Sequence, residues 1–324
     1  MNDLSAPKPP FTGAIDVHAH FLTPRLREAL LAAGHEHPDG MPALPDWTAA
    51  AALDLMDRTG VRAAMLSVSS PGVLLDDPLA TRALARAVNE EGAAVVRDHP
   101  DRFGLFASVP LPDVTAALAE TAYALDELGA DGVALETNYR GTYLGDATFD
   151  PLLAELNDRK AVVHLHPTSP ACWEHTSLGR PRPMLEFLFD TTRTVAQLVL
   201  DRTLDRYPDI EFIVPHAGAA LPVFADRIAG FAVIEAPHAP LDVLAALRRL
   251  HYDLAGFALP RALPALLRMV APDRLLYGSD FPFTPDWAVQ GLAHALAADE
   301  QLAPAAQRAM LRDNALRLFP RLSA

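Results

Sequence analysis

Short apolar segments rich in β-branched residues alternate along this 324-residue chain with longer segments of helical period. Eight of the short segments have the length and composition of strands: 13–18, 62–68, 103–109, 132–137, 161–166, 211–216, 250–255 and 274–279. Strands that alternate with helices are typical of repeated βα units around a parallel sheet. Because eight such strands close a barrel, the pattern predicts an α/β fold of the (β/α)8 class, the TIM barrel.

The segments between these strands carry helix start and stop signals. One of them, DVTAALAETAYALDELGA, begins with Asp113 as an N-cap and stops at a glycine. No internal repeat, low-complexity tract or linker divides the sequence, so we predict one barrel domain over residues 13–324 behind a disordered leader, residues 1–12. Two less regular stretches, 35–47 and 168–183, are predicted to be loop insertions over the C-terminal face, where such loops commonly build substrate sites.

Composition narrows the classes of function. The formal net charge of −14 argues against a nucleic-acid surface, because phosphate binding needs clustered lysine and arginine. Cys172 is the only cysteine, so an intrachain disulfide is impossible and an oxidising compartment is not implied. The chain has no apolar run of about 18 residues for a membrane span, and its first ten residues do not resemble a signal peptide. We therefore expect a cytoplasmic protein with no membrane or nucleic-acid partner.

Polar residues stand at the ends of several predicted strands. In the stretch IDVHAHF, alternate side chains share one face of the strand, so His18 and His20 point the same way. Strand ends matter because the active sites of TIM barrels lie at the C-terminal face. Three other strands end in residues that would converge on the same opening: His166, His216 and Asp280.

Nitrogen and oxygen donors in this combination suit zinc, manganese or iron, with a position left for water or substrate. We assign one divalent metal to four ligands: His18, His20, His166 and Asp280. His216 remains as an acid or base beside the metal. A lone histidine at a strand end is more often a structural residue than a ligand, but four of them, two in an HxH pair, favour the metal. Strand four offers Glu136 and no lysine to bridge a second ion, which favours a single metal.

Other residues near the strand ends have less specific signals. His164 shares a face with His166 one layer deeper in the barrel, and is expected to be packed or hydrogen-bonded behind the site. Asp16 is expected to be a structural hydrogen-bond acceptor near the barrel floor. The aromatic residues near the strand ends suit a flat aromatic ligand and are equally well explained as packing: Trp173, Phe257, Phe281 and Phe283.

Four motifs together resemble the amidohydrolase superfamily: the HxH pair, VVHLHP, FIVPHAGAALP and LLYGSDFPF. Their order and spacing are similar to the branch that contains aminocarboxymuconate semialdehyde decarboxylase, and the resemblance covers nearly the whole chain. It implies a metal-dependent, non-oxidative decarboxylase. The residues matching the four ligands named above would bind zinc or manganese, and the histidine matching His216 would do acid–base work.

The resemblance also implies a homodimer. An arginine matching Arg227 reaches into the neighbouring subunit of such enzymes and holds a substrate carboxylate; without the resemblance, a helix-surface salt bridge is the plainer interpretation. A second clamping arginine of aminocarboxymuconate semialdehyde decarboxylase is replaced here by Ala52, so its dicarboxylate substrate is not expected. The segments PDGMPALPDW and GRPRPMLEFLFDTTRT look more like 6-methylsalicylate decarboxylases, whose substrate has one carboxylate beside a phenol.

The leading hypothesis is therefore decarboxylation of an ortho-hydroxybenzoate such as 6-methylsalicylate, or of a related unsaturated carboxylate. The ring carbon that carries the carboxylate is protonated, with Asp280 as donor and His216 to hold or move the proton, and CO₂ then leaves. A different hypothesis is that the same metal activates water for attack on a lactone, ester or amide. A barrel used only for binding would be expected to have lost a ligand, and none is lost here.

Overall fold

A computed structural model describes residues 8–239 and 241–323 of the chain. Eight parallel strands form one sheet in the order β1-β2-β3-β4-β7-β8-β9-β10. Their bounds are β1 (Ala14–His20), β2 (Val61–Ser67), β3 (Phe103–Ser108), β4 (Gly132–Glu136), β7 (Val162–His166), β8 (Glu211–Val214), β9 (His251–Asp253) and β10 (Leu275–Leu276). Each strand overlaps one of the eight predicted segments, so the predicted barrel is confirmed.

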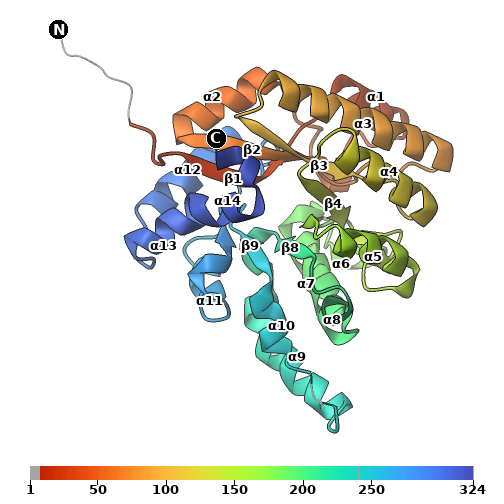
Figure 1. Cartoon of the computed structure of the whole chain (residues 1–324), viewed down its shortest axis with the longest axis vertical. Coiled ribbons are helices and arrows are strands. Elements are labelled where there is room, and N and C mark those ends of the chain that lie inside the picture. Colours follow the sequence, from red (N-terminus) through yellow and green to blue (C-terminus); the bar gives the residue numbers. More distant parts are fainter. Residues whose placement is uncertain (1–7, 240, 324) are drawn as a thin grey trace.

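Helices cover the outside of this sheet (Figure 1). Their bounds are α1 (Pro24–Ala32), α2 (Ala49–Thr59), α3 (Pro78–Asp98), α4 (Val114–Asp126), α5 (Asp150–Asp158), α6 (Trp173–Thr176), α7 (Glu186–Leu200), α8 (Thr203–Arg206), α9 (Leu221–Glu235), α10 (Val243–Arg249), α11 (Ala262–Leu266), α12 (Asp286–Ala297), α13 (Pro304–Arg308) and α14 (Asn314–Leu318). The predicted N-cap of α4 is present, because the Asp113 side chain accepts a hydrogen bond from the N–H of Ala116. No helix in the described ranges is long and apolar enough to cross a membrane.

Shorter elements fill the connections. The antiparallel pair β5 (Asn138–Tyr139) and β6 (Thr142–Tyr143) follows β4. Single-turn helices are η1 (Pro38–Gly40), η2 (Ala147–Phe149), η3 (Arg182–Met184), η4 (His216–Gly218), η5 (Pro272–Arg274) and η7 (Pro320–Ser323), and η6 (Ala309–Asp313) is a π-helical turn. Of these, η1 and η3 lie in the two predicted loop insertions, and η4 directly follows β8.

The barrel closes where the chain after β10 meets β1. Parallel bridges pair Asp16 with Tyr277 and Ala19 with Phe281, and the N–H of His20 donates to the carbonyl of Phe281 at 2.7 Å. β10 itself has only two residues, so the seam consists of isolated bridges. On its other side, the seven-residue strand β1 pairs with β2 along a longer ladder.

The two ends of the barrel differ. At the N-terminal end, Phe319 and Leu322 of the C-terminal segment pack against apolar residues from the strands, including Ile15 and Phe106. The ring of Phe319 meets the ring of Phe106 edge-on at 5.6 Å between centroids. Because this end is filled by apolar side chains, the C-terminal end of the barrel is left for chemistry.

The packed chain begins before residue 13. Residues 1–7 of the expected leader lie outside the described residues. Phe11, which the sequence analysis placed in that leader, is buried, and its N–H donates to the carbonyl of Thr59 at 3.1 Å. Its ring packs edge-on against Tyr277, because burial of an aromatic side chain outweighs the cost of ordering a few flanking residues.

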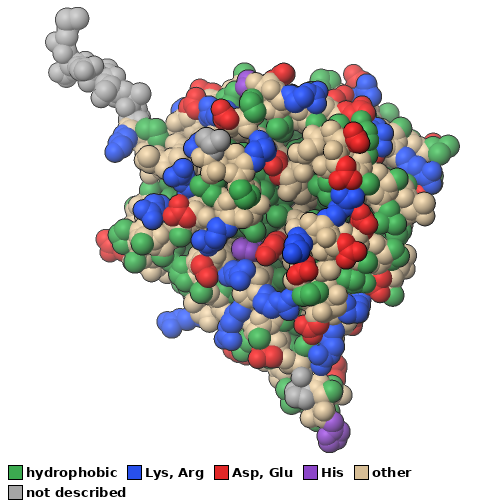
Figure 2. All heavy atoms as spheres, in the orientation of Figure 1, with side chains coloured by type: hydrophobic (Ala, Val, Ile, Leu, Met, Phe, Trp, Pro, Cys, Tyr) green, Lys and Arg blue, Asp and Glu red, His purple; other side chains and the backbone are tan. Residues whose placement is uncertain are grey.

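On the face of the molecule shown in Figure 2, basic and acidic side chains are interspersed with hydrophobic ones.

Candidate active site

Five of the predicted site residues come together at the C-terminal end of the barrel. His18 and His20 stand on β1 and His166 ends β7, whereas His216 and Asp280 lie in the turns after β8 and β10. Both turn residues have left-handed backbone, with φ of 56° for His216 and 60° for Asp280. Such conformations are uncommon outside glycine and cluster at functional sites.

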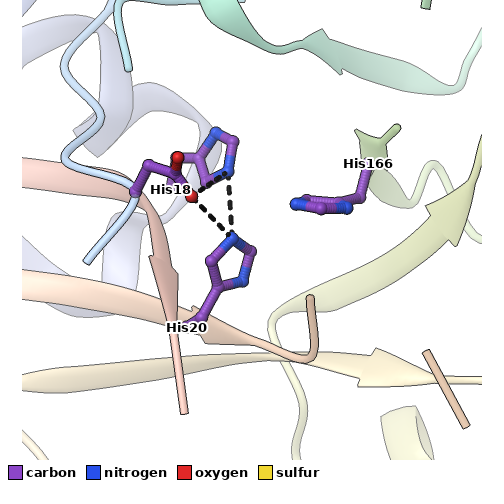
Figure 3. Close-up of side chains that lie close together, drawn as sticks. His18, His20 and His166 are labelled. Carbon is purple, nitrogen blue, oxygen red and sulfur yellow. Dashed lines mark hydrogen bonds and ion pairs between the residues drawn. The ribbon is translucent and has the colours of Figure 1, made fainter. Parts of the chain in front are cut away.

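Four of these residues have the spacing of metal ligands. One donor atom each from His18, His20, His166 and Asp280 lies within 4.8 Å of the others, and Figure 3 shows the three rings turned toward a common space. The two Nε2 atoms of His18 and His20 are 3.1 Å apart, and Asp280 Oδ1 lies 3.2 Å from the His20 Nε2. Ligands that share a zinc ion at bonds of about 2.1 Å are separated by roughly 3.0–3.5 Å, so the donor set fits a single divalent ion.

Hydrogen bonds on the far side of two rings fix their tautomers. His18 donates from Nδ1 to the Asp253 carboxylate at 2.9 Å. His20 has its Nδ1 2.9 Å from the Ser67 hydroxyl and 3.3 Å from the Ser67 carbonyl. That hydroxyl donates its own proton to the carbonyl of Ala19, so both oxygens accept from the His20 Nδ1. Protons on both Nδ1 atoms leave two Nε2 lone pairs facing each other across 3.1 Å. Such a pair needs a positive charge between the nitrogens, which is the arrangement typical of histidines that bind a metal.

In the metal-free protein, burial and neighbouring charges shift the pKa values of the clustered side chains. Burial lowers the pKa of His18, but the charge and hydrogen bond of Asp253 outweigh it and raise that pKa to about 9. Burial lowers the pKa of His20, and that of His166 falls well below its usual value because burial and the neighbouring imidazoles act together. For Asp280, burial is outweighed by the neighbouring imidazoles of His20, His216 and His18, which hold its pKa well below the usual range.

His166 faces a carboxyl group on the neighbouring strand. β4 and β7 pair Glu136 with His166 in register, which places Glu136 Oε2 3.6 Å from the His166 Nδ1. Among the described residues, neither of these two buried atoms has a hydrogen-bond partner, and burial raises the pKa of Glu136 well above its usual value. A hydrogen bond donated by the His166 Nδ1 to this carboxyl group would leave the Nε2 of His166 free for a metal.

His216 lies beside the cluster at a longer distance. Its Nε2 is 3.8 Å from Asp280 Oδ2, and its backbone N–H donates to Asp253 at 3.1 Å. The same Asp280 oxygen accepts a hydrogen bond from Thr284 at 3.0 Å. Asp280 therefore presents Oδ1 to the imidazoles and Oδ2 to the group that the sequence analysis expects to move a proton.

Asp253 is the residue that the sequence analysis missed. Its carboxylate is fully buried and also accepts from the His164 Nε2 at 3.3 Å. His18, His164 and Asp253 thus form a second close group, which these hydrogen bonds explain. The expectation that His164 lies packed behind the site is confirmed, since its ring stacks on Phe106. The signal for Asp253 was a lone carboxylate inside the apolar strand segment HYDLA.

Asp16 is a structural hydrogen-bond acceptor, as the sequence analysis expected. Its Oδ1 accepts hydrogen bonds from the N–H groups of His18 and Ser279, both at 3.0 Å. Asp16 therefore connects β1 to the segment after β10 and does not face the cluster.

A cavity of about 550 Å³ opens from the cluster toward solvent. Its polar lining is His166, His216 and Asp280 together with Asp39, Ser69, Ser70 and Thr284, and most of the remaining lining is apolar, with side chains such as Met184, Phe187 and Phe283. No lysine or arginine is among the described residues that line it. Such a mostly apolar cavity with a few polar groups at one end is typical of small-molecule sites.

Three residues expected to bind substrate lie outside this cavity. Phe281 lines a separate small hollow beside Trp47, because the left-handed turn at Asp280 directs the next side chain away. Trp173 lines a neighbouring cavity of about 310 Å³ and lies under the Arg182 guanidinium at 4.1 Å. Arg227 is exposed on α9, with its guanidinium 5.0 Å from the ring centroid of Phe231.

The chain is similar to known proteins over nearly its whole length. The family model described as "Amidohydrolase" matches residues 15–321. The decarboxylase yanB of Aspergillus niger is 36% identical over 323 residues, covering 95% of this chain and 87% of that protein. The 6-methylsalicylic acid decarboxylase of Penicillium expansum is 38% identical over 315 residues, covering 95% and 96%.

Among solved structures, an amidohydrolase II crystal structure is 38% identical to this chain, with a TM-score of 0.91. The match covers 95% of this chain and all of the other. The family model, the sequence relatives and the solved structure agree over nearly the same span as the four motifs. The chain therefore belongs to the amidohydrolase family.

Proposed function

We propose that the protein is a metal-dependent, non-oxidative carboxy-lyase that decarboxylates an ortho-hydroxybenzoate of the 6-methylsalicylate type. The observation that carries the proposal is the meeting of three buried imidazoles and Asp280 at one end of a mostly apolar cavity. A cation and a flat aromatic acid can be held side by side there. Relatives named as decarboxylases support the same reaction.

The metal site would use the four clustered side chains: His18, His20, His166 and Asp280. Zinc is our first choice and manganese the second, because both accept mixed nitrogen and oxygen ligands and cellular supply decides between them. When bound, the ion supplies positive charge that orients the phenol and carboxylate oxygens of the substrate and offsets their charge.

Asp280 and His216 are the groups placed to move a proton. A substrate carboxylate beside Asp280 favours its protonated form, because like charges at short distance raise a pKa. Asp280 then donates the proton to the ring carbon that carries the carboxylate. The bond between that carbon and the carboxylate breaks, its electron pair restores the aromatic ring, and CO₂ leaves. His216, 3.8 Å from Asp280 Oδ2, returns a proton to Asp280.

Turnover in D₂O tests the reaction directly. Protein loaded with zinc or manganese is mixed with 6-methylsalicylate, and the products are analysed by mass spectrometry. We expect a phenol lighter by CO₂ that carries one deuterium at the vacated ring carbon, and we expect none from protein stripped of metal. Turnover of lactones, esters or amides, with the hydroxybenzoates untouched, would replace the decarboxylase by the hydrolase.

The dimer is part of this proposal. Figure 1 shows α9 and α10 projecting away from the barrel, and α9 exposes apolar side chains, including Val223 and Ile234. Exposed apolar surface of this kind marks an interaction site. We propose that a second copy covers this face and that Arg227, which has no acidic partner among the described ion pairs, reaches the neighbouring substrate site.

Mixing two inactive variants tests whether Arg227 acts across subunits. Arg227→Ala lacks the arginine, His166→Ala lacks a proposed metal ligand, and their mixed dimer has one site with both. After the two proteins are unfolded and refolded together, we expect about a quarter of wild-type activity, because half of the dimers are mixed and each has one complete site. Activity no higher than the sum of the separate variants would contradict a role across the interface.

A further inference from the structure

The cavity at the metal cluster has two chemically different parts. Its polar lining consists of His166, His216 and Asp280 together with Asp39, Ser69, Ser70 and Thr284. Its apolar lining comes from several segments, among them one containing Met184 and Phe187 before and within α7, and one containing Phe257 after β9. A bound hydroxybenzoate with its carboxylate and phenol at the polar part therefore presents the rest of its ring to apolar side chains.

The cavity is larger than a small ring acid requires. Its volume of about 550 Å³ lies in the range of roughly 300–1,000 Å³ that encloses drug-sized ligands. A salicylate with a single methyl substituent is well below that size. Ligand surface beyond the ring and methyl group is needed to fill the apolar part.

Two apolar side chains of the wall are exposed while the cavity is open. Phe257 is 82% exposed and Met184 is 59% exposed, although both line the cavity. Covering such surface by an apolar group removes it from water and favours binding. Within one copy of the chain, no lysine or arginine lines the cavity among the described residues. The Arg227 proposed to reach in from a second copy would be engaged by the substrate carboxylate, so the wall offers no basic partner to a second carboxylate or a phosphate on the ring.

We propose that the preferred substrate is an ortho-hydroxybenzoate whose ring carries an unbranched apolar chain of several carbons, which lies against Met184 and Phe257. This inference rests on the proposed decarboxylase function and names its substrate class more narrowly. Chain length is then the main determinant of specificity, because the polar end of the cavity treats all such acids alike.

A series of 6-alkylsalicylates with methyl, propyl and pentyl chains tests the inference on the metal-loaded full-length protein. Each methylene buried in the cavity is expected to lower KM by up to about fourfold, so KM for the pentyl acid should be at least tenfold lower than for the methyl acid. Binding of 3-pentylphenol, the expected product, is measured by calorimetry without turnover. A negative heat-capacity change that grows with chain length is expected, because apolar surface is buried.

Substitutions in the exposed wall test where the alkyl chain of the substrate lies. Met184→Ser and Phe257→Ser should each lower the ratio of kcat/KM for the pentyl acid to kcat/KM for the methyl acid by about fivefold or more. The matched control is Leu79→Ser, which removes an apolar side chain on α3 that is 69% exposed, between the values for Met184 and Phe257, and lies outside this cavity. The control should leave the ratio unchanged.

The possible failures are distinguishable. Turnover of the methyl acid with an equal or higher KM for the pentyl acid would overturn the inference and leave the decarboxylase intact. No turnover of any acid, with one metal per chain confirmed, would overturn the decarboxylase itself. A ratio unaffected by both serine variants would overturn the placement of the chain on this wall.

Discussion

Replacing His166 by alanine is expected to remove bound metal and turnover together. His166 is buried in the centre of the C-terminal face, and a donor atom of its ring lies within 4.8 Å of the donor atoms of His18, His20 and Asp280. With this nitrogen gone, only two imidazoles and one carboxylate remain. We expect metal affinity to fall by more than about a hundredfold, beyond the effect of losing a group that merely supports a ligand. Chelator competition and metal analysis measure the loss.

The matched control is His216→Ala. His216 lies near Asp280 but is not in the group of close donor atoms, so this variant should keep one metal per chain while turnover falls by about a hundredfold or more, as expected for a lost proton-transfer group. Full metal retention in His166→Ala would show that the ligand assignment is wrong. Equal metal loss in both variants would place His216 among the ligands.

Asp253→Asn is expected to weaken the metal site without changing any proposed ligand. One carboxylate oxygen of Asp253 accepts from two backbone N–H groups, those of His216 and Ala255. The other oxygen accepts from His18 and His164. An asparagine keeps its carbonyl toward the backbone donors, so its NH₂ group must face the two rings.

The substitution then reverses the hydrogen bond to His18. The NH₂ group donates to the His18 Nδ1, which moves the ring proton to Nε2, the atom directed at the other donors of the cluster. We expect metal affinity to fall by about tenfold to a hundredfold. Nitrogen-15 NMR of the metal-free protein, recorded above the His18 pKa of about 9 so that the ring is neutral, should report the change of His18 tautomer independently of activity.

Asp16→Asn is the control for Asp253→Asn. Asp16 is another buried carboxylate close to His18, and burial raises its pKa to about 7. Its Oδ1 accepts from the backbone N–H groups of His18 and Ser279, and an asparagine carbonyl oxygen can do the same. Metal affinity within about twofold of wild type is expected, because no ring nitrogen is addressed. A similar loss in both variants would mean that general weakening of the buried charge network, rather than the His18 tautomer, causes the effect.

The alternation of strand-like and helical segments in the sequence predicted most of the fold. Apolar segments of strand length are separated by helical segments, and a parallel barrel brings all strand ends to one face. The positions of His18, His20, His166, His216 and Asp280 could therefore be inferred without contacts. Asp253 could not be assigned in this way, because its hydrogen bond to His18 joins residues 235 positions apart and depends on side-chain direction inside the barrel.

The substrate wall was harder to predict for a local reason. Phe281 and Phe283 both follow Asp280 closely, but only Phe283 lines the cavity. The left-handed backbone at Asp280 sets which of the two side chains faces inward, and the sequence carries no rule for that turn. Phe257, which the sequence analysis named, does line the cavity. Met184 was not predicted, because it belongs to a loop whose course depends on packing across the mouth.

The proposed metal ligands lie on both sides of the seam that closes the barrel, so a bound ion would also affect the stability of the fold. The first strand and the segment after β10 come from opposite ends of the chain and meet through isolated bridges. His18 and His20 lie on one side of this junction, and Asp280 lies on the other. An ion bound by these proposed ligands would hold the two sides of the junction together, and its binding free energy would add to the cost of opening it. Loss of the ion would then remove activity and weaken the closure of the barrel at the same time.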